Sequence, residues 1–298
     1  MAIRLTHIPT DESMRETTSH GTHAFPFEYY VDDILQFDSG FVEWHWHAEF
    51  EWIMVKEGMV DCCVGSERHH LLPGDGMFIN SRMIHHFESE TGGIMPNILF
   101  LPSFLAPQDS AVYQEWIAPV LQSGRTCLLL SGKDECAQHL LALLQHIFDL
   151  ADAVPKDLLA IQIAAMQLWH SFYREYGAYF TREENPRDML LQARTRKMLQ
   201  FIQTNYVNKI TLEQIAQSAS VSRSEALRCF HAAMQRTPVE YLIDYRLAKA
   251  RQLLLSTDDN VSDVALQVGI ENISYFVRIF KKRYGQTPGA CRRNTITS

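Results

Sequence analysis

The sequence predicts an α+β protein in which a β-barrel is followed by two helices and then by an all-helical domain. Three observations predict this class. Short apolar runs separated by turn residues occupy residues 25–130, two apolar stripes at helical spacing follow, and a helical unit is repeated near the end. The 298 residues are enough for about two domains of ordinary size.

Residues 1–130 are expected to form the barrel. The runs Glu51–Val55, Val60–Val64 and Gly76–Asn80 have the length of strands, and turn signals such as Pro73-Gly74-Asp75 separate them. Many short strands of this kind favour a barrel or a sandwich.

Residues 131–180 are expected to form two helices that make a dimerisation segment. Apolar residues recur at helical spacing from Cys136 to Ile147 and from Leu158 to Phe172, and Pro155 is placed to begin the second helix. These apolar faces could instead pack wholly on the barrel of their own chain. The polar stretch TREENP predicts a linker at residues 181–187, followed by a helical domain at residues 188–298.

The helical domain contains a repeat. Arg228 and Phe230 recur as Arg278 and Phe280 at an offset of 50 residues, whereas other paired positions lie 49 apart, so the second turn has one extra residue. Each copy predicts a helix, a short turn and a longer helix, which is the helix-turn-helix unit of DNA-binding proteins. Residues 238–255 predict a helix between the copies. The side chains expected to cap helix starts are Thr211, Ser222, Ser262 and Asn272.

The net charge of −8 conceals a division along the chain. Residues 187–298 carry 17 Lys and Arg against 9 Asp and Glu, a net of +8, and the preceding residues carry 10 against 26, a net of −16. Twelve of the 13 histidines lie in the acidic part. A basic helical domain suits DNA, because lysine and arginine replace the counterions of phosphates.

The helical domain resembles the DNA-binding domain of the AraC/XylS family over about residues 188–293. The resemblance rests on ITLEQIAQSASVSRSEALRCF, on the spacing of Pro238, Tyr241, Arg246 and Ala250, and on VSDVALQVGIENISYFVRIFKKRYGQTPGACRR. Three positions depart from the family pattern. Gln235 replaces a glycine that would cap the first long helix, His231 replaces a lysine, and Ile270 replaces a phenylalanine.

This resemblance implies that the second helix of each unit enters the major groove of DNA. Arg228 and Arg278 occupy equivalent places and are expected to reach base edges, where arginine can contact guanine through two hydrogen bonds. Lys282 and Arg283 are expected to contact phosphate or solvent. The candidate DNA-contacting residues are Arg223, Ser224, Leu227, Arg228 and His231 in the first unit and Asn272, Ser274, Tyr275, Arg278 and Lys281 in the second.

A second candidate site lies in the barrel. Alternation along a strand places His45 and His47 on one face, Glu51 shares their parity, and His85 follows on a later strand. Imidazole and carboxylate groups are ligands of divalent metals. The surrounding residues 38–90 resemble the two cupin motifs, although Asn80 and Arg82 replace the usual proline and glycine.

Three interpretations of this set stay open. It could bind a divalent metal, it could contact a small-molecule effector without requiring any cofactor, or it could pack the mouth of the barrel. We expect His69, His70 and His86 to lie in turns or at the surface. The tryptophans expected on the opposite side, against the two later helices or a partner, are Trp44, Trp46 and Trp52.

The order of motifs predicts a bacterial, sequence-specific transcription regulator. Its cupin-like barrel would sense a small molecule such as a sugar or a related metabolite and control binding of a homodimer to promoter DNA, with RNA polymerase as a further partner if it activates. The alternative is a metal-dependent cupin enzyme, a dioxygenase or isomerase, with a DNA-binding tail. The six cysteines lack C-x-x-C spacing and no apolar run reaches membrane-spanning length, so we expect a cytoplasmic, nucleoid-associated protein.

Overall fold

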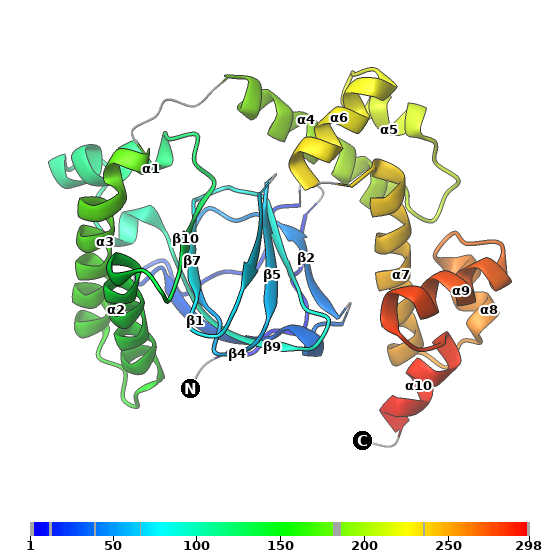
Figure 1. Ribbon diagram of the computed structural model, residues 1–298, viewed down its shortest axis with the longest axis horizontal. Coiled ribbons are helices and arrows are strands. Elements are labelled where there is room, and N and C mark those ends of the chain that lie inside the picture. Colours follow the sequence, from blue (N-terminus) through cyan, green and yellow to red (C-terminus); the bar gives the residue numbers. More distant parts are fainter. Residues whose placement is uncertain are drawn as a thin grey trace. The chain divides into compact units, whose positions relative to one another are not determined.

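The computed structural model describes residues 3–11, 14–38, 40–65, 67–180, 186–234 and 236–296 (Figure 1). By internal contacts the chain divides into two compact units, Met1–Phe37 with Phe41–Leu190, and Asp38–Gly40 with Leu191–Ser298. The first unit contains two β-sheets and a pair of long helices, and the second is helical. The predicted fold class is therefore confirmed.

Two antiparallel sheets face each other and form the barrel. One has the strand order β1-β9-β3-β7-β10, with β4 paired to β9, and the other has the order β2-β8-β5-β6. The strands are β1 (Phe27–Asp33), β2 (Phe41–His45), β3 (Phe50–Met54), β4 (Glu57–Gly58), β5 (Val60–Val64), β6 (Glu67–Leu71), β7 (Gly76–Ile79), β8 (His85–Glu88), β9 (Gly93–Phe100) and β10 (Cys127–Leu130).

Strand β3 is covered on both faces, which explains why its sequence is almost entirely apolar. Phe50 and Trp52 pack in the core that the larger sheet shares with the long helices, and Ile53 packs in the core between the two sheets. Successive side chains of a strand point to opposite faces, so Glu51 shares the inner face with Ile53. The sequence of β3 thus places one carboxyl group inside the barrel.

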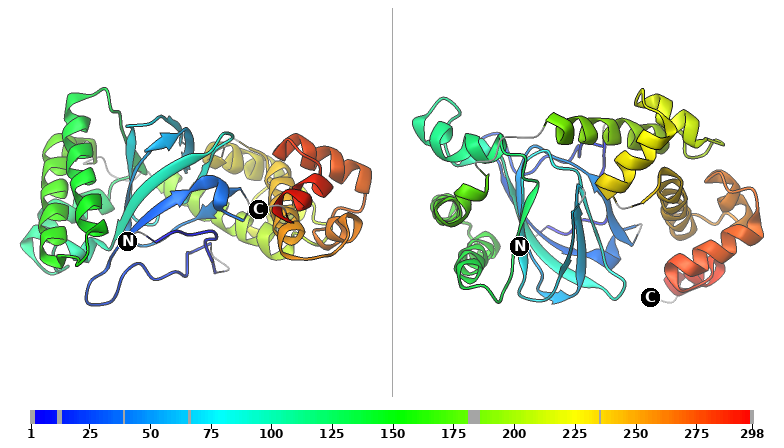
Figure 2. Two further views of the ribbon diagram at one scale, coloured as in Figure 1. Left: turned by 90° about the horizontal axis from the view of Figure 1, so that it is seen from below. Right: turned by 45° about the horizontal axis from the view of Figure 1, so that its top comes forward.

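Helices α2 (Glu135–Asp152) and α3 (Leu158–Phe180) run side by side along the outer face of the larger sheet (Figure 2). Both predicted helices are confirmed, but Pro155 does not begin the second. Asp157 does, because its carboxylate accepts a hydrogen bond from the Ala160 amide at 3.0 Å. Trp52 packs on Phe172 of α3 with ring centroids 5.0 Å apart, as predicted for the tryptophans.

The other two tryptophans of that prediction lie elsewhere. Trp44 stacks on His86, with ring centroids 4.4 Å apart, and Trp46 lies under the Arg15 guanidinium at 5.9 Å. His86 is buried, so its expected place at the surface was wrong. Strand β2 belongs to the smaller sheet, and the helices cover the other one, so alternation alone could not show what these rings contact.

Short helical turns that the sequence did not predict interrupt the barrel between β9 and β10. They comprise Pro102–Phe104, Tyr113–Ile117 and α1 (Ala118–Leu121). Their buried side chains Phe104, Ile117 and Val120 extend the core between the larger sheet and the long helices.

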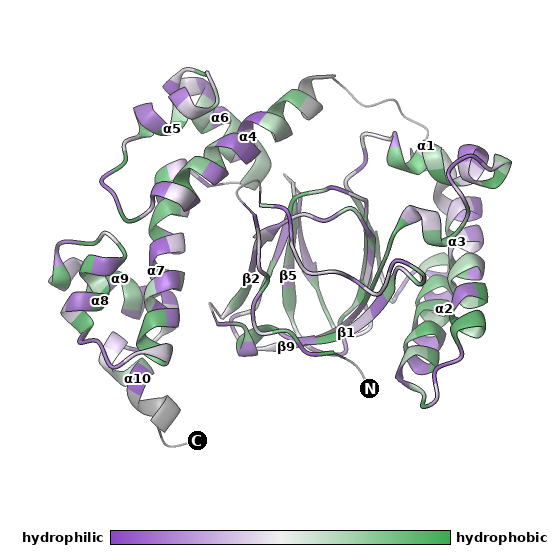
Figure 3. Ribbon diagram, turned by 180° about the vertical axis from the view of Figure 1, so that it is seen from behind, coloured by the Kyte–Doolittle hydropathy of each residue, from purple (hydrophilic) through white to green (hydrophobic). Residues whose placement is uncertain are grey.

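Seven helices follow residue 185 within the described residues, and the first of them, α4, crosses the boundary between the two units. Figure 3 shows hydrophobic and hydrophilic residues mixed along them. Helix α4 begins at Pro186, so the last two residues of the predicted linker belong to a helix, where proline suits the first position. Residues 181–185 lie outside the described residues. The helices are α4 (Pro186–Asn205), α5 (Leu212–Ser218), α6 (Arg223–Met234), α7 (Pro238–Ser256), α8 (Val261–Gln267), α9 (Ile273–Tyr284) and α10 (Pro288–Ile296).

Helices α5–α6 and α8–α9 form the two predicted helix-turn-helix units. The first turn runs from residue 219 to 222 and the second from 268 to 272, which confirms the extra residue. Each turn contains one residue with a positive φ, Ser220 at 56° and Gly269 at 79°. A Cβ at Gly269 would lie 2.5 Å from the Val207 carbonyl oxygen, so only glycine fits there. Gln235, one of the departures from the family pattern, lies outside the described residues.

Candidate functional sites: a polar cluster in the barrel and two exposed helix faces

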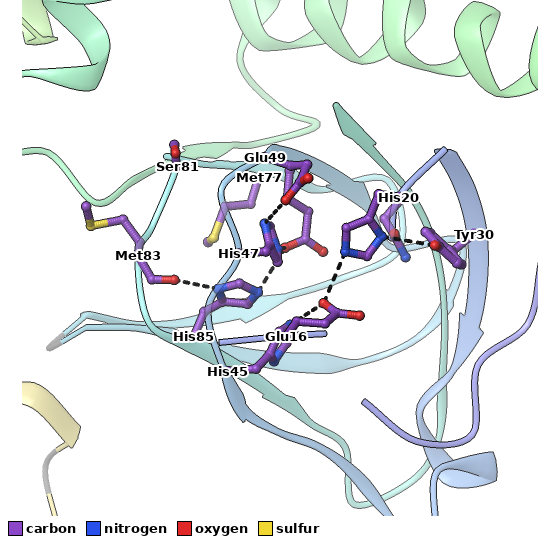
Figure 4. A network of polar contacts seen from close by, with 12 residues as sticks. Glu16, His20, Tyr30, His45, His47, Glu49, Met77, Ser81, Met83 and His85 are labelled. Carbon is purple, nitrogen blue, oxygen red and sulfur yellow. Dashed lines mark hydrogen bonds and ion pairs between the residues drawn. The ribbon is translucent and has the colours of Figure 1, made fainter. Parts of the chain in front are cut away.

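The structure brings His45, His47 and His85 together inside the barrel (Figure 4), and Glu51 contacts two of these rings. We call these four residues the polar barrel cluster. Glu51 Oε2 lies 3.0 Å from His85 Nε2 and 3.5 Å from His47 Nε2. The ring centroids of His45 and His85 are 4.2 Å apart. All four residues are buried, so the cluster is a concentration of polar groups in an otherwise apolar interior.

Two of these rings are oriented by the backbone. The Nδ1 atom of His45 lies 2.8 Å from the Glu43 carbonyl oxygen, and the Nδ1 atom of His85 lies 2.8 Å from the Met83 carbonyl oxygen. A carbonyl oxygen only accepts, so each Nδ1 carries the proton and donates it. The Nε2 atom of each ring is therefore turned toward the cluster, an arrangement typical of histidines that hold a ligand or a metal.

The segment before β1 adds two residues that sequence reasoning missed. Glu16 Oε2 lies 3.3 Å from His20 Nε2 and 3.9 Å from His45 Nε2, and His20 Nδ1 lies 3.0 Å from the Tyr30 hydroxyl (Figure 4). Glu16 and His20 are both buried. Their spacing of four residues was visible in the sequence, but no periodic element there pointed to the barrel.

Burial and mutual attraction oppose each other in these groups. Burial alone would raise the pKa of Glu51, but the imidazole of His85 and its neighbours outweigh it and hold that pKa well below its usual range. The same balance, with His20 the main partner, lowers the pKa of Glu16 to about 2. Burial, aided by His85, lowers the pKa of His45 to about 3. At neutral pH, two carboxylates, Glu51 in the cluster and Glu16 beside it, thus lie near a neutral His45.

The donor set fits a divalent metal. One nitrogen from each of His45, His47 and His85 lies within 4.8 Å of the others, and the Glu51 carboxylate contacts two of these rings. Three imidazoles and a carboxylate are ligands that zinc and other first-row divalent metals accept. The same atoms can also hydrogen-bond a small polar molecule.

A cavity of about 520 Å³ lies beside the polar barrel cluster. Its lining includes Glu16, His20 and Glu49, and Glu49 Oε2 lies 3.7 Å from His47 Nδ1. The rest of the lining is rich in hydroxyl and charged groups: Asp11, Arg15, Thr17, Thr18, Ser19, Thr22 and His23. The volume is within the range of small-molecule sites.

The long helices α6 and α9 each present a polar face to solvent. In α6, all five candidate residues are exposed: Arg223, Ser224, Leu227, Arg228 and His231. In α9 and at its N-cap, Asn272, Ser274, Arg278 and Lys281 are exposed, and Tyr275 is half-buried. The opposite sides carry the core residues Phe230 and Phe280. The candidate DNA-contacting residues therefore share one side of each helix.

The two equivalent arginines have different surroundings. Arg228 forms two hydrogen bonds with the Glu225 carboxylate, at 2.7 and 2.9 Å, and Arg194 also pairs with Glu225 at 2.9 Å. Arg278 lies over the Tyr275 ring at 5.5 Å. To contact a base, Arg228 would have to break its hydrogen bonds with Glu225. Within the described residues, Arg278 has no such carboxylate contact and lies over the ring of Tyr275.

Comparisons with known proteins agree with this division. An AraC-like ligand binding domain matches residues 37–168 and a helix-turn-helix domain matches residues 215–294. The HTH-type transcriptional regulator YdeC of Bacillus subtilis (strain 168) is 32% identical over 281 residues, which cover 93% of this chain and 95% of that protein. A barrel for ligands joined to two helix-turn-helix units defines a transcription regulator of the ligand-binding class.

The chain belongs to the AraC family of helix-turn-helix transcription regulators. This family assignment decides against the cupin enzyme alternative. The transcriptional activator and DNA repair enzyme AdaA of Bacillus subtilis (strain 168) is 36% identical over 94 residues, but these cover only 32% of this chain and 44% of AdaA. Among solved structures, fatty acid-bound ToxT of Vibrio cholerae covers 88% of this chain and 93% of its own, with 12% identity and a TM-score of 0.43.

No helix in the described part of the chain combines the length and apolar character that a membrane span requires.

Proposed function

We propose that a small polar molecule binds in the barrel of this regulator and thereby controls its binding to promoter DNA. The main support for the proposal is that several buried polar atoms of the polar barrel cluster lack a hydrogen-bond partner within the described part of the protein. Both ring nitrogens of His47, Nε2 of His85 and Oε2 of Glu51 are buried without a well-aligned hydrogen bond inside the protein. Buried polar atoms normally have hydrogen-bond partners, so a bound molecule is the natural partner here.

The neighbouring cavity supports a hydroxylated or anionic ligand. Arg15 offers a cation, and the threonine and serine hydroxyls offer donors and acceptors. A molecule in this cavity would contact Glu49 and His20, which link it to the polar barrel cluster. Sugars and sugar acids match this lining.

A divalent metal in the polar barrel cluster is a second element of the proposal. His45, His47, His85 and Glu51 would hold it, and it would offer the ligand a Lewis-acidic contact. The paired contacts of His45 and His85 with backbone carbonyls favour this role, because they fix the rings with Nε2 facing inward. Elemental analysis of the purified protein tests it, and a mutant lacking His85 should lose the metal.

The exposed faces of α6 and α9 are the proposed DNA contacts, with Arg228 and Arg278 at base edges. The protein would act as a homodimer on paired half-sites at the bacterial nucleoid, in the cytoplasm, and would contact RNA polymerase if it activates transcription. Leu159, Ile163 and Met166 support the dimer, since they form an exposed apolar stripe on α3.

The experiment is a crossed comparison on the full-length protein. Thermal-shift screening of sugars, sugar acids, amino acids and aromatic acids should find a compound that raises the melting temperature. DNA that co-purifies with the protein supplies the promoter for affinity measurements. His47→Ala should lose the response to the compound while keeping its affinity for promoter DNA. Arg278→Ala should keep the response to the compound and bind the promoter about 5- to 150-fold more weakly, a loss of about 1–3 kcal/mol.

Two outcomes would contradict the proposal. If no compound raised the melting temperature of the protein, with or without added metal, the proposal that the barrel binds an effector would be contradicted. An Arg278→Ala loss that is equal on promoter and random DNA would assign Arg278 to phosphate rather than base contact. Lys282→Ala is the matched control, because Lys282 is exposed one turn further along α9 and is expected to contact phosphate. Its removal should therefore lower the affinity for promoter DNA and for random DNA by the same factor.

A further inference from the structure

A second group of metal-ligating side chains lies where the edges of the two sheets meet. Glu67 and His69 are two residues apart on β6, the edge strand of the smaller sheet, and Cys127 begins β10, the edge strand of the larger one. One ligand atom of each residue lies within 4.8 Å of the others. Among the described residues, only this group and the histidines of the polar barrel cluster meet that condition.

The distances in this group are those of a tetrahedral site. Cys127 Sγ lies 3.6 Å from His69 Nε2, and the same nitrogen lies 3.6 Å from Glu67 Oε2. With a zinc–sulfur bond of about 2.3 Å and a zinc–nitrogen bond of about 2.0–2.1 Å, tetrahedral geometry separates sulfur from nitrogen by about 3.5 Å. The three side chains therefore need little rearrangement to hold one ion.

A supporting hydrogen bond orients the carboxylate. The Thr126 hydroxyl donates to Glu67 Oε1 at 2.6 Å, while Oε2 faces His69. Contacts of this kind position metal ligands and are part of most metal sites.

Solvent can reach the group from one side. The side chains of Glu67 and His69 are 43% and 21% exposed, whereas Cys127 is buried beneath them. An ion can therefore arrive through the carboxylate and the imidazole and bind the sulfur last. The expectation that His69 lies at the surface is thus only half correct, since its ring covers a buried thiol.

We propose that Glu67, His69 and Cys127 bind a thiophilic divalent cation, with Zn²⁺ as the preferred class. Sulfur, nitrogen and oxygen together match zinc, which is borderline soft, better than magnesium or calcium. The ion joins β6 to β10 and so closes the two sheets along one edge, with water in the fourth position. The thiol loses its proton to solvent as the zinc–sulfur bond forms.

Cobalt(II) substitution tests the site, because a sulfur ligand gives a thiolate-to-cobalt charge-transfer band. The polar barrel cluster contains no sulfur and cannot produce it. Full-length protein freed of metal with a chelator is titrated with Co²⁺, and Zn²⁺ is then added to displace it. We expect the band in the wild-type protein and in Cys136→Ser, whose thiol is exposed on α2, and its loss in Cys127→Ser.

A second measurement guards against misfolding of Cys127→Ser. His69→Gln changes a half-buried residue, and we expect it to bind Zn²⁺ more than about tenfold more weakly and to lose most of the zinc-induced rise in melting temperature. Absence of the band from the wild-type protein would overturn the proposal. So would a band that persists in Cys127→Ser, or a His69→Gln protein that binds zinc as well as the wild type; a hydrogen-bonded chain of the three side chains would then be the correct description.

Discussion

Asp32 is a carboxyl group enclosed by the barrel. It lies on β1, and Asn97 on β9 donates its Nδ2 hydrogen bond to Asp32 Oδ2 at 2.8 Å. Burial, reinforced by the negative charge of Glu51, raises the pKa of Asp32 to about 7 despite that hydrogen bond. Folding therefore keeps Asp32 in its neutral form up to about pH 7, far above the pH at which the unfolded chain ionises it.

The sign of the resulting pH dependence follows from this raised pKa. The unfolded chain ionises Asp32 near its ordinary value of 3.8, so stability from the neutral form is complete below that pH and is lost as pH rises through about 7. Asp32→Asn keeps the shape without the charge. We expect it to match the wild type near pH 4 and to exceed it in free energy of unfolding by on the order of 2–4 kcal/mol at pH 8. Urea unfolding across this range measures the difference, and a difference that does not change with pH would refute the assignment.

The sequence predicted the positions of individual site residues only where they lie in or beside regular secondary structure. The structure brings His45, His47, Glu51 and His85 together, although β2 ends at His45 and His47 lies just beyond it. Their chemical role remains a prediction. Glu16 and His20 were missed because they lie in a segment without helix or strand periodicity, and only the folded chain shows that it turns back toward the barrel.

At the scale of elements, the sequence predicted most helix starts correctly but placed one of them two residues too late. Thr211, Ser222 and Asn272 cap α5, α6 and α9 as predicted, each accepting a hydrogen bond from the amide three residues on. The start predicted at Ser262 was wrong. Asn260 caps α8 instead, because its Oδ1 accepts from the Asp263 amide at 2.9 Å, which brings Val261 into the helix. Two polar residues two positions apart were equally good caps in the sequence.

The corrected cap gives a matched pair of mutants. Asn260→Ala removes the side chain that satisfies the first turn of α8 and should lower the free energy of unfolding of the helical domain by about 1 kcal/mol. Ser262→Ala changes an exposed residue inside the helix and should alter it by less than about 0.5 kcal/mol. Chemical denaturation of the two full-length variants measures both values. Equal effects, or a larger loss at Ser262, would restore the original prediction.

For the whole molecule, the short apolar runs, the two apolar stripes and the helical repeat predicted the fold class, because each part of the chain has its own hydrophobic period. The barrel strands, the two long helices and the repeated units each bury a face of their own. The helical turns between β9 and β10 and the zinc-type group at the sheet edges could not be predicted. Both depend on contacts between residues far apart in the chain, such as Glu67 and Thr126.

The assembly of two chains is the remaining question at this scale, and α3 offers a direct test. Leu159, Ile163 and Met166 are 67%, 47% and 45% exposed, and their spacing of four and three residues aligns them along one side of the helix. If this stripe joins two copies, light scattering should give twice the chain mass of 34.3 kDa. Ile163→Glu should shift the mass toward a single chain, since a charge buried in an apolar interface is costly. Gln217→Glu, which adds the same charge at an exposed polar position of α5, away from this stripe, should leave the dimer intact. A wild-type protein that stays a single chain at micromolar concentration, or two variants that behave alike, would assign the dimer contact to another surface.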